Sequence, residues 1–209
     1  HMTSRRALLT GLGAAGAGAT LAAPAIAQDK RVLTMVTTWP RGLSGIWTGV
    51  ERFAQRVSAM SGGTLEIQAF AGGEAVAPFD SFNVVRTGEY DMYHACEYYW
   101  QGNNPAYNFF TTVPYGFTDD EHTSWIRNGG GQALWDEIAA EYGLKSVLCG
   151  NTGVQMGGWY ANPIQSAEDL KGLRIRIPGM AADIFRELGA EPVTLPGGAI
   201  PQALFSGEI

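Results

Sequence analysis

Segments with strand-like and helix-like patterns alternate along the chain from Arg31 onwards, and this alternation restricts the possible folds more than any other feature. Apolar and β-branched runs typical of strands cover residues 31–39, 64–70, 91–95, 144–150, 173–178 and 191–196. Helical periodicity covers residues 44–63, 78–90, 122–142, 180–190 and 199–208. Strands that alternate with helices favour parallel sheets joined by helical crossovers. We therefore predict an α/β fold.

The second half of the chain repeats the scheme of the first half in shorter form. The predicted helices at residues 78–90 and 199–208 both lead into a small residue followed by Gly, Glu and an apolar residue. In the first copy a strand follows at once, whereas the second copy reaches Ile209 at that point. We therefore expect two α/β lobes, residues 28–148 without a return segment and residues 149–209 as an incomplete second lobe.

Residues 1–27 have the pattern of an export signal. A basic start with Arg5 and Arg6 leads into a Gly/Ala-rich run that ends in A-x-A at Ala27. The S-R-R-x-L-L stretch is typical of a twin-arginine signal, with a chance arginine pair in a general secretory signal as the alternative. A spanning helix needs about 20 strongly apolar residues, which this run does not supply. We predict cleavage after Ala27 and a periplasmic protein.

The charge balance argues against nucleic acid as a partner. Loss of the signal would reduce the 14 Lys and Arg residues to 12, against 20 Asp and Glu, for a formal net charge of −8. The two cysteines, Cys96 and Cys149, would lie in an oxidising compartment, where they form one disulfide or remain two separate small residues. The sequence contains no Cys-x-x-Cys pair, so we do not expect a structural zinc site.

The stretch L-R-I-R-I-P-G at residues 173–179 places arginines inside a predicted strand. Side chains alternate between the faces of a strand, so Ile175 and Ile177 share one face while Arg174 and Arg176 share the other. Ligands of open parallel sheets gather at the carboxyl ends of strands. Arg176 is closest to that end and could bind a carboxylate through two hydrogen bonds, or form a structural ion pair instead.

Other polar and aromatic residues follow predicted strands without forming a recognisable catalytic set. Gln155 lies in a glycine-rich turn, where a water-facing glutamine is the simpler interpretation. Tyr98 and Tyr99 precede Trp100, and such a cluster is commonly part of a core. The sequence contains no nucleophile elbow, phosphate-binding loop or H-E-x-x-H motif. We therefore expect a protein that is not an enzyme.

Three stretches together resemble one family. The sequence G-N-T-G-V-Q-M-G-G-W-Y at residues 150–160 and the stretch at residues 166–204 resemble the substrate-binding proteins of tripartite ATP-independent periplasmic (TRAP) transporters, the DctP family. Residues 96–117, which begin C-E-Y-Y-W, are similar to the branch of that family that binds α-keto acids. The resemblance extends from about Arg31 to Ile209.

The resemblance implies a periplasmic-binding-protein-like fold, with two lobes that close over a ligand in the cleft between them. It implies a receptor that captures a small 2-oxo acid such as pyruvate and delivers it to the TRAP membrane permease subunits. The family arginine that pairs with the substrate carboxylate corresponds to Arg176. The glutamine that holds substrate and a bound cation, Na⁺ or Ca²⁺, corresponds to Gln155, and Tyr98 and Tyr99 would line the pocket.

The sequence departs from the family pattern at its end. In the family an E-W-[VT]-G-P-like stretch follows S-G-E-I-D-A-A, and its Glu and Trp help to bind the cation, whereas this sequence reaches Ile209 before it. We therefore expect an incomplete cation site. Two other functions remain as alternatives, a ligand-sensing module for a signalling partner and a periplasmic enzyme that acts on the same acids.

Overall fold

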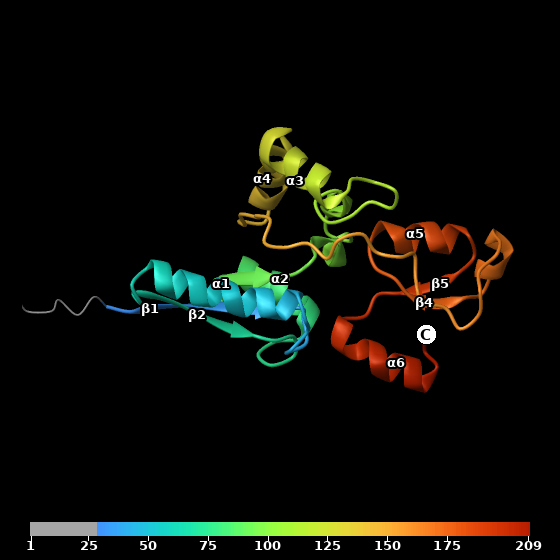
Figure 1. The fold of residues 1–209 in the computed structure, drawn as a ribbon, viewed down its shortest axis with the longest axis horizontal. Coiled ribbons are helices and arrows are strands. Elements are labelled where there is room, and N and C mark those ends of the chain that lie inside the picture. Colours follow the sequence, from blue (N-terminus) through green and yellow to red (C-terminus); the bar gives the residue numbers. More distant parts are fainter. Residues whose placement is uncertain (1–28) are drawn as a thin grey trace, which may run out of the picture.

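The computed structural model describes residues 29–209, so the predicted export signal at residues 1–27 lies outside the described part. The fold is α/β, with a three-stranded sheet in the order β2-β1-β3 and a separate two-stranded sheet, β4-β5 (Figure 1). All strand pairs are parallel, as the alternating pattern predicted. Within residues 29–209, no helix is long and apolar enough to cross a membrane.

The first sheet follows the predicted order of elements. Strand β1 (Arg31–Thr37) lies between β2 (Leu65–Phe70) and β3 (Met92–His94). Helix α1 (Ile46–Met60) connects β1 to β2, and helix α2 (Ser81–Arg86) connects β2 to β3. The carboxyl ends of all three strands therefore lie at one edge of this sheet.

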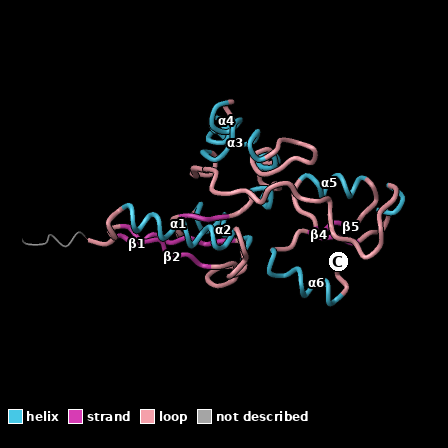
Figure 2. The backbone as a smooth tube through the Cα atoms, in the orientation of Figure 1, coloured by secondary structure: helices cyan, strands magenta, loops and turns pink. Residues whose placement is uncertain are grey.

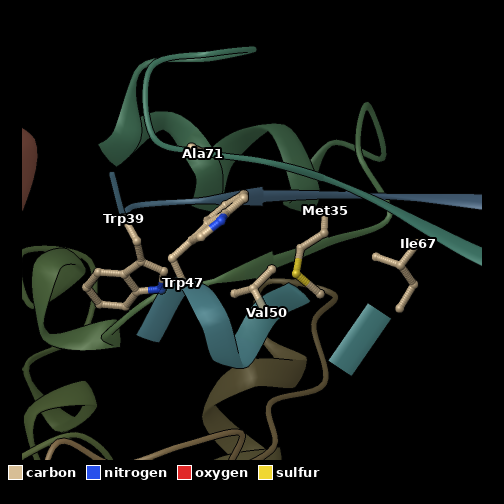
Figure 3. Packing of buried hydrophobic residues seen from close by; sticks show 6 residues of the cluster. All are labelled: Met35, Trp39, Trp47, Val50, Ile67 and Ala71. Atoms are coloured by element: carbon tan, nitrogen blue, oxygen red, sulfur yellow. The ribbon is translucent and has the colours of Figure 1, made fainter. Parts of the chain in front are cut away.

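The core of this part of the chain forms between α1 and the sheet. Met35 and Ile67 extend from the strands, and Trp47 and Val50 extend from α1 to meet them; Figure 3 shows Met35 and Val50 pointing toward one another. The amphipathic pattern of residues 44–63 therefore buries its apolar side against the sheet, as expected for a crossover helix.

The second sheet consists of short elements. Strand β4 (Arg174–Arg176) pairs with β5 (Glu191–Val193), and helix α5 (Met180–Glu187) connects them. Helix α6 (Ile200–Ser206) follows. The predicted alternation is present in β4, because Ile175 is buried between an exposed Arg174 and a half-buried Arg176.

The prediction of one helix at residues 122–142 was wrong. Two helices occupy this region, α3 (Asp119–Asn128) and α4 (Gly131–Ala140). Between them Gly130 adopts φ 87°, a left-handed conformation that ends a right-handed helix and that glycine adopts without steric cost.

The prediction of a strand at residues 144–150 was also wrong. The segment runs as a loop (Figure 2), and no strand within residues 29–209 pairs with it. Its polar groups find other partners: the Ser146 carbonyl accepts a hydrogen bond from Gln132 Nε2 at 2.9 Å. An apolar pattern alone does not make a strand, because a strand also needs a neighbour to complete its backbone hydrogen bonds.

Glu97 holds several of these elements together through a buried carboxylate. It begins the short 3₁₀ helix η2 (Glu97–Trp100) and is 5% exposed. Its Oε1 accepts hydrogen bonds from the Tyr93 hydroxyl at 2.6 Å and the Ser146 hydroxyl at 2.7 Å, while Oε2 accepts from Trp135 Nε1 at 2.5 Å. Among the described residues no Lys or Arg pairs with it. The three donors replace the water that a buried carboxylate loses.

We predict that Glu97→Gln lowers the free energy of unfolding by about 3 kcal/mol, because the amide nitrogen would replace one of the two oxygens to which donors converge. Urea unfolding followed by tryptophan fluorescence measures the change. Glu137→Gln, on the exposed side of α4, is the matched control and should change stability by less than about 0.5 kcal/mol. Equal effects of both substitutions would contradict the role of Glu97.

His94 ends β3 and faces a tryptophan from the end of β1. Trp39 Nε1 donates a hydrogen bond to His94 Nδ1 at 2.6 Å, and the two rings meet edge to face. Burial disfavours the charged imidazolium and lowers the pKa of His94 to about 4. Protonation of His94 Nδ1 would also place its N–H against the N–H of Trp39, and two donors do not form a hydrogen bond with each other.

The lowered pKa of His94 predicts a pH dependence of stability. Between the unfolded pKa near 6.5 and the folded value near 4, the unfolded state binds the proton and the folded state does not, so His94 makes stability fall as the pH falls through this window. The loss should reach about 3 kcal/mol at pH 4. Urea unfolding between pH 4 and 7 should show this slope in the wild type and a shallower slope in His94→Gln. Equal slopes would contradict the prediction.

Candidate functional site

The candidate site is centred on Arg176 at the carboxyl end of β4. Its Nε and Nη2 donate hydrogen bonds to the Leu195 carbonyl at 2.9 and 2.7 Å, and Nη2 also donates to the Tyr99 hydroxyl at 3.2 Å. Among the described residues no ion pair involves Arg176. Arg176 is half-buried, and neutral groups position its guanidinium. No carboxylate of the described residues neutralises its charge.

Tyr98 and Tyr99 lie on η2, opposite Arg176. Both are half-buried, and their rings meet edge to face with centroids 4.8 Å apart. Tyr99 also packs on Phe79 at 4.8 Å, and the guanidinium carbon of Arg176 lies 5.9 Å from the centroid of the Tyr99 ring. Burial raises the pKa of both tyrosines, so that both phenols stay neutral at physiological pH.

The hydrogen bond between Arg176 and Tyr99 determines what the hydroxyl can do next. Arginine is only a donor, so the Tyr99 oxygen accepts in this pair and its own proton points elsewhere. Arg176 likewise keeps both hydrogens of Nη1 outside the bonds to Leu195 and Tyr99. Positive charge and hydroxyl donor therefore lie together, a combination that suits an anionic oxygen ligand.

Gln155 does not join this group in the structure. Its side chain is exposed, and Nε2 donates to Thr152 Oγ1 at 2.7 Å within the same loop. No described hydrogen bond connects it to Arg176, Tyr98 or Tyr99. Of the four predicted site residues the structure thus brings together Arg176 and Tyr99, with Tyr98 beside them, and leaves Gln155 apart.

No group of three His, Cys, Asp or Glu side chains within residues 29–209 is close enough to hold a metal ion. The carbonyl oxygen of Gln155 remains outside the bond to Thr152, and amide oxygens suit hard cations such as Na⁺ and Ca²⁺. Gln155 fits the chemistry of such a cation as one ligand among several.

Neither of two surface hollows is lined by Arg176, and the two cysteines do not form a disulfide. A hollow of about 360 Å³ is lined by α3 and residues 148–151, and one of about 270 Å³ is lined mainly by residues 160–164. Cys96 is half-buried and Cys149 is exposed, and both are free thiols, so the disulfide alternative is not realised in the structure.

Sequence reasoning missed two partners of the site. Leu195 acts through its backbone carbonyl, which every residue carries and no side-chain pattern reveals. Glu97 fixes the start of η2 through Tyr93, Ser146 and Trp135. An acidic residue immediately before an aromatic triplet was the only available signal for Glu97.

The comparisons with known proteins agree on one family. The model of the family DctP, described as bacterial extracellular solute-binding protein family 7, matches residues 36–209. A monocarboxylate 2-oxoacid-binding periplasmic protein of Nostoc sp. is 39% identical over 175 residues, which cover 84% of this chain and 48% of that protein.

Two solved structures of TRAP periplasmic solute-binding proteins are similar in fold and sequence. The protein of Pseudoalteromonas atlantica, with bound sodium and pyruvate, has a TM-score of 0.83 and 38% identity, over 87% of this chain and 55% of that one. The protein of Colwellia psychrerythraea, with bound calcium and pyruvate, gives the same TM-score, identity and coverage.

The chain spans about half the length of the relatives that it matches. The family match nevertheless extends over most of the chain, and the residues that carried the resemblance in the sequence lie within it. The chain therefore belongs to bacterial extracellular solute-binding protein family 7, the DctP family of TRAP solute-binding proteins.

Proposed function

We propose that this chain forms part of a periplasmic receptor that binds a small 2-oxo monocarboxylate such as pyruvate and delivers it to the membrane permease subunits of a TRAP transporter. The observation that carries the proposal is the half-buried guanidinium of Arg176, which no carboxylate of the described chain neutralises. The 2-oxoacid-binding relative and the two pyruvate-bound structures support this ligand class. As in the rest of the family, the function is binding and not catalysis.

The ligand carboxylate would approach the guanidinium at its Nη1 end. The Leu195 carbonyl occupies the side formed by Nε and Nη2, so it fixes the plane of the guanidinium before a ligand arrives. A fixed donor set loses less conformational entropy on binding than a free one. The Tyr99 proton would then serve a carboxylate oxygen or the 2-oxo oxygen of the same ligand.

The arrangement of the elements supports two lobes with the ligand between them. In this proposal residues 28–148 belong to the first lobe and residues 149–209 to the second. Tyr98 and Tyr99 would line the cleft from the first lobe, and Arg176 would face them from the second. Export would use the twin-arginine signal expected at residues 1–27.

A cation would bind together with the ligand. One of the two similar structures has bound sodium and pyruvate, and the other has bound calcium and pyruvate. Gln155 would supply its carbonyl oxygen as one ligand, and the bound carboxylate would supply another, because both ions prefer oxygen ligands. The cation would neutralise part of the ligand's negative charge.

Arg176→Ala should weaken pyruvate binding by roughly 100-fold, because it leaves a desolvated carboxylate without its charge partner. Arg176→Lys should retain part of the affinity, since it keeps the charge and loses the planar donor pair. Isothermal titration calorimetry with pyruvate, succinate and a neutral sugar measures both affinity and ligand class. Arg174→Ala, on the same strand but exposed, is the control. Tighter binding of succinate, or an unchanged affinity in Arg176→Ala, would refute the assignment.

Removal of Na⁺ and Ca²⁺ should weaken pyruvate binding, and Gln155→Ala should reduce the dependence on the cation along with the affinity. Titrations in choline buffer with a chelator, repeated after addition of each ion, test this expectation. Gln165→Ala removes an exposed glutamine outside the proposed site and should behave as wild type. The cation assignment is wrong if affinity is the same with and without both ions.

A further inference from the structure

The side chain of Asn108 caps helix α5, which lies much later in the sequence. Asn108 is 3% exposed, and its Oδ1 accepts a hydrogen bond at 2.8 Å from the backbone nitrogen of Met180, which begins α5. Its Nδ2 donates to Gln101 Oε1 at 2.9 Å and to the Pro105 carbonyl at 3.0 Å. Because the Met180 amide can only donate and the Pro105 carbonyl can only accept, the orientation of the Asn108 amide is determined.

The start of α5 fits closely against this cap. Gly179, which precedes the helix, is buried and adopts φ 67°. A Cβ at this position would lie 2.9 Å from Asn108 Oδ1 and 3.0 Å from Tyr98 Cβ, so a larger residue could not approach so closely. The first amide groups of a helix have no partner within the helix, and Asn108 satisfies one of them from 72 residues away.

The capped helix is directly connected to the ligand site. Arg176 lies three residues before Gly179, and its bond to Tyr99 joins residues 77 positions apart. Both bonds connect the β4–α5 unit, residues 174–187, to the segment of η2 and η3 (Pro105–Asn108). A displacement of α5 from Asn108 would therefore also move Arg176 relative to Tyr99.

We propose that Asn108 is a positioning residue for the ligand site. It holds the β4–α5 unit against Tyr98 and Tyr99, so that the positive charge of Arg176 and the Tyr99 hydroxyl stand together before the ligand binds. This inference rests on the proposed function for its ligand. Loss of the cap would lower the fraction of molecules with the site assembled, and the apparent affinity would fall by the same factor.

Asn108→Ala tests the proposal with three readouts, two of which need no ligand. In the ligand-free protein we expect the Met180 amide to exchange hydrogen at least tenfold faster, and the radius of gyration from small-angle X-ray scattering to increase. We expect calorimetry to show pyruvate bound about tenfold more weakly. Asn103→Ala, an exposed asparagine in the same region, is the control and should leave all three unchanged.

A purely structural role would lower the urea midpoint and leave the affinity of the folded protein unchanged. Unchanged amide exchange or radius of gyration, or unchanged affinity in a protein that binds pyruvate, would overturn the proposal. The wild type could also bind no 2-oxo acid, while Asn108→Ala still speeds hydrogen exchange at the Met180 amide and increases the radius of gyration. In that case the proposed function is wrong and the positioning role of Asn108 is supported.

A second variant covers the case in which Asn108→Ala does not fold. Gly179→Ala displaces the same bond from the other side, because its Cβ would meet Asn108 Oδ1. Faster exchange at Met180 together with weaker binding is again expected. Gly102→Ala, where a Cβ meets open space, is its matched control.

Discussion

Glu97 places a buried carboxylate where β3, α4 and the loop at residues 144–150 meet, and three donors converge on its two oxygens. No cation of the described chain shares this site, so any shift of one donor would leave a buried charge less well solvated. The first residue of η2 is therefore fixed, and with it the direction of Tyr98 and Tyr99, which follow immediately. A local electrostatic requirement thus determines one wall of the candidate site.

The other wall, which carries Arg176, is held against the first by hydrogen bonds. The two sheets share no strand, and the hydrogen bonds between their regions include those from Arg176 to the Tyr99 hydroxyl and from the start of α5 to the Asn108 amide. These bonds position the two regions relative to one another although no strand connects them. Two separate sheets joined by such contacts are consistent with the proposed receptor.

The sequence predicted the regular part of the fold and one part of the site. Hydrophobic periodicity located the elements of both sheets, and the position of Arg176 nearest the carboxyl end of its strand made it the candidate of the two arginines on that face. The prediction failed at residues 122–142, where Gly130 divides the helix, and at residues 144–150, where an apolar pattern has no partner strand among residues 29–209. Gln155 matched a family motif, yet its position depends on tertiary contacts that a pattern does not encode. The hydrogen bond between Asn108 and Met180 joins residues 72 positions apart, so a local sequence pattern cannot predict it.

The pairing of Arg176 with a backbone carbonyl has a consequence for how ligand preference can change. Substitution at position 195 alters the side chain and leaves the backbone carbonyl in place. The orientation of the guanidinium therefore depends on the path of the backbone after β5. Substitution at position 195 therefore leaves this acceptor in place, whereas the aromatic side of the site consists of the side chains of Tyr98 and Tyr99, which substitution does change. Acceptance of a longer or bulkier acid would then evolve on the aromatic side of the site, around a charge that stays where it is.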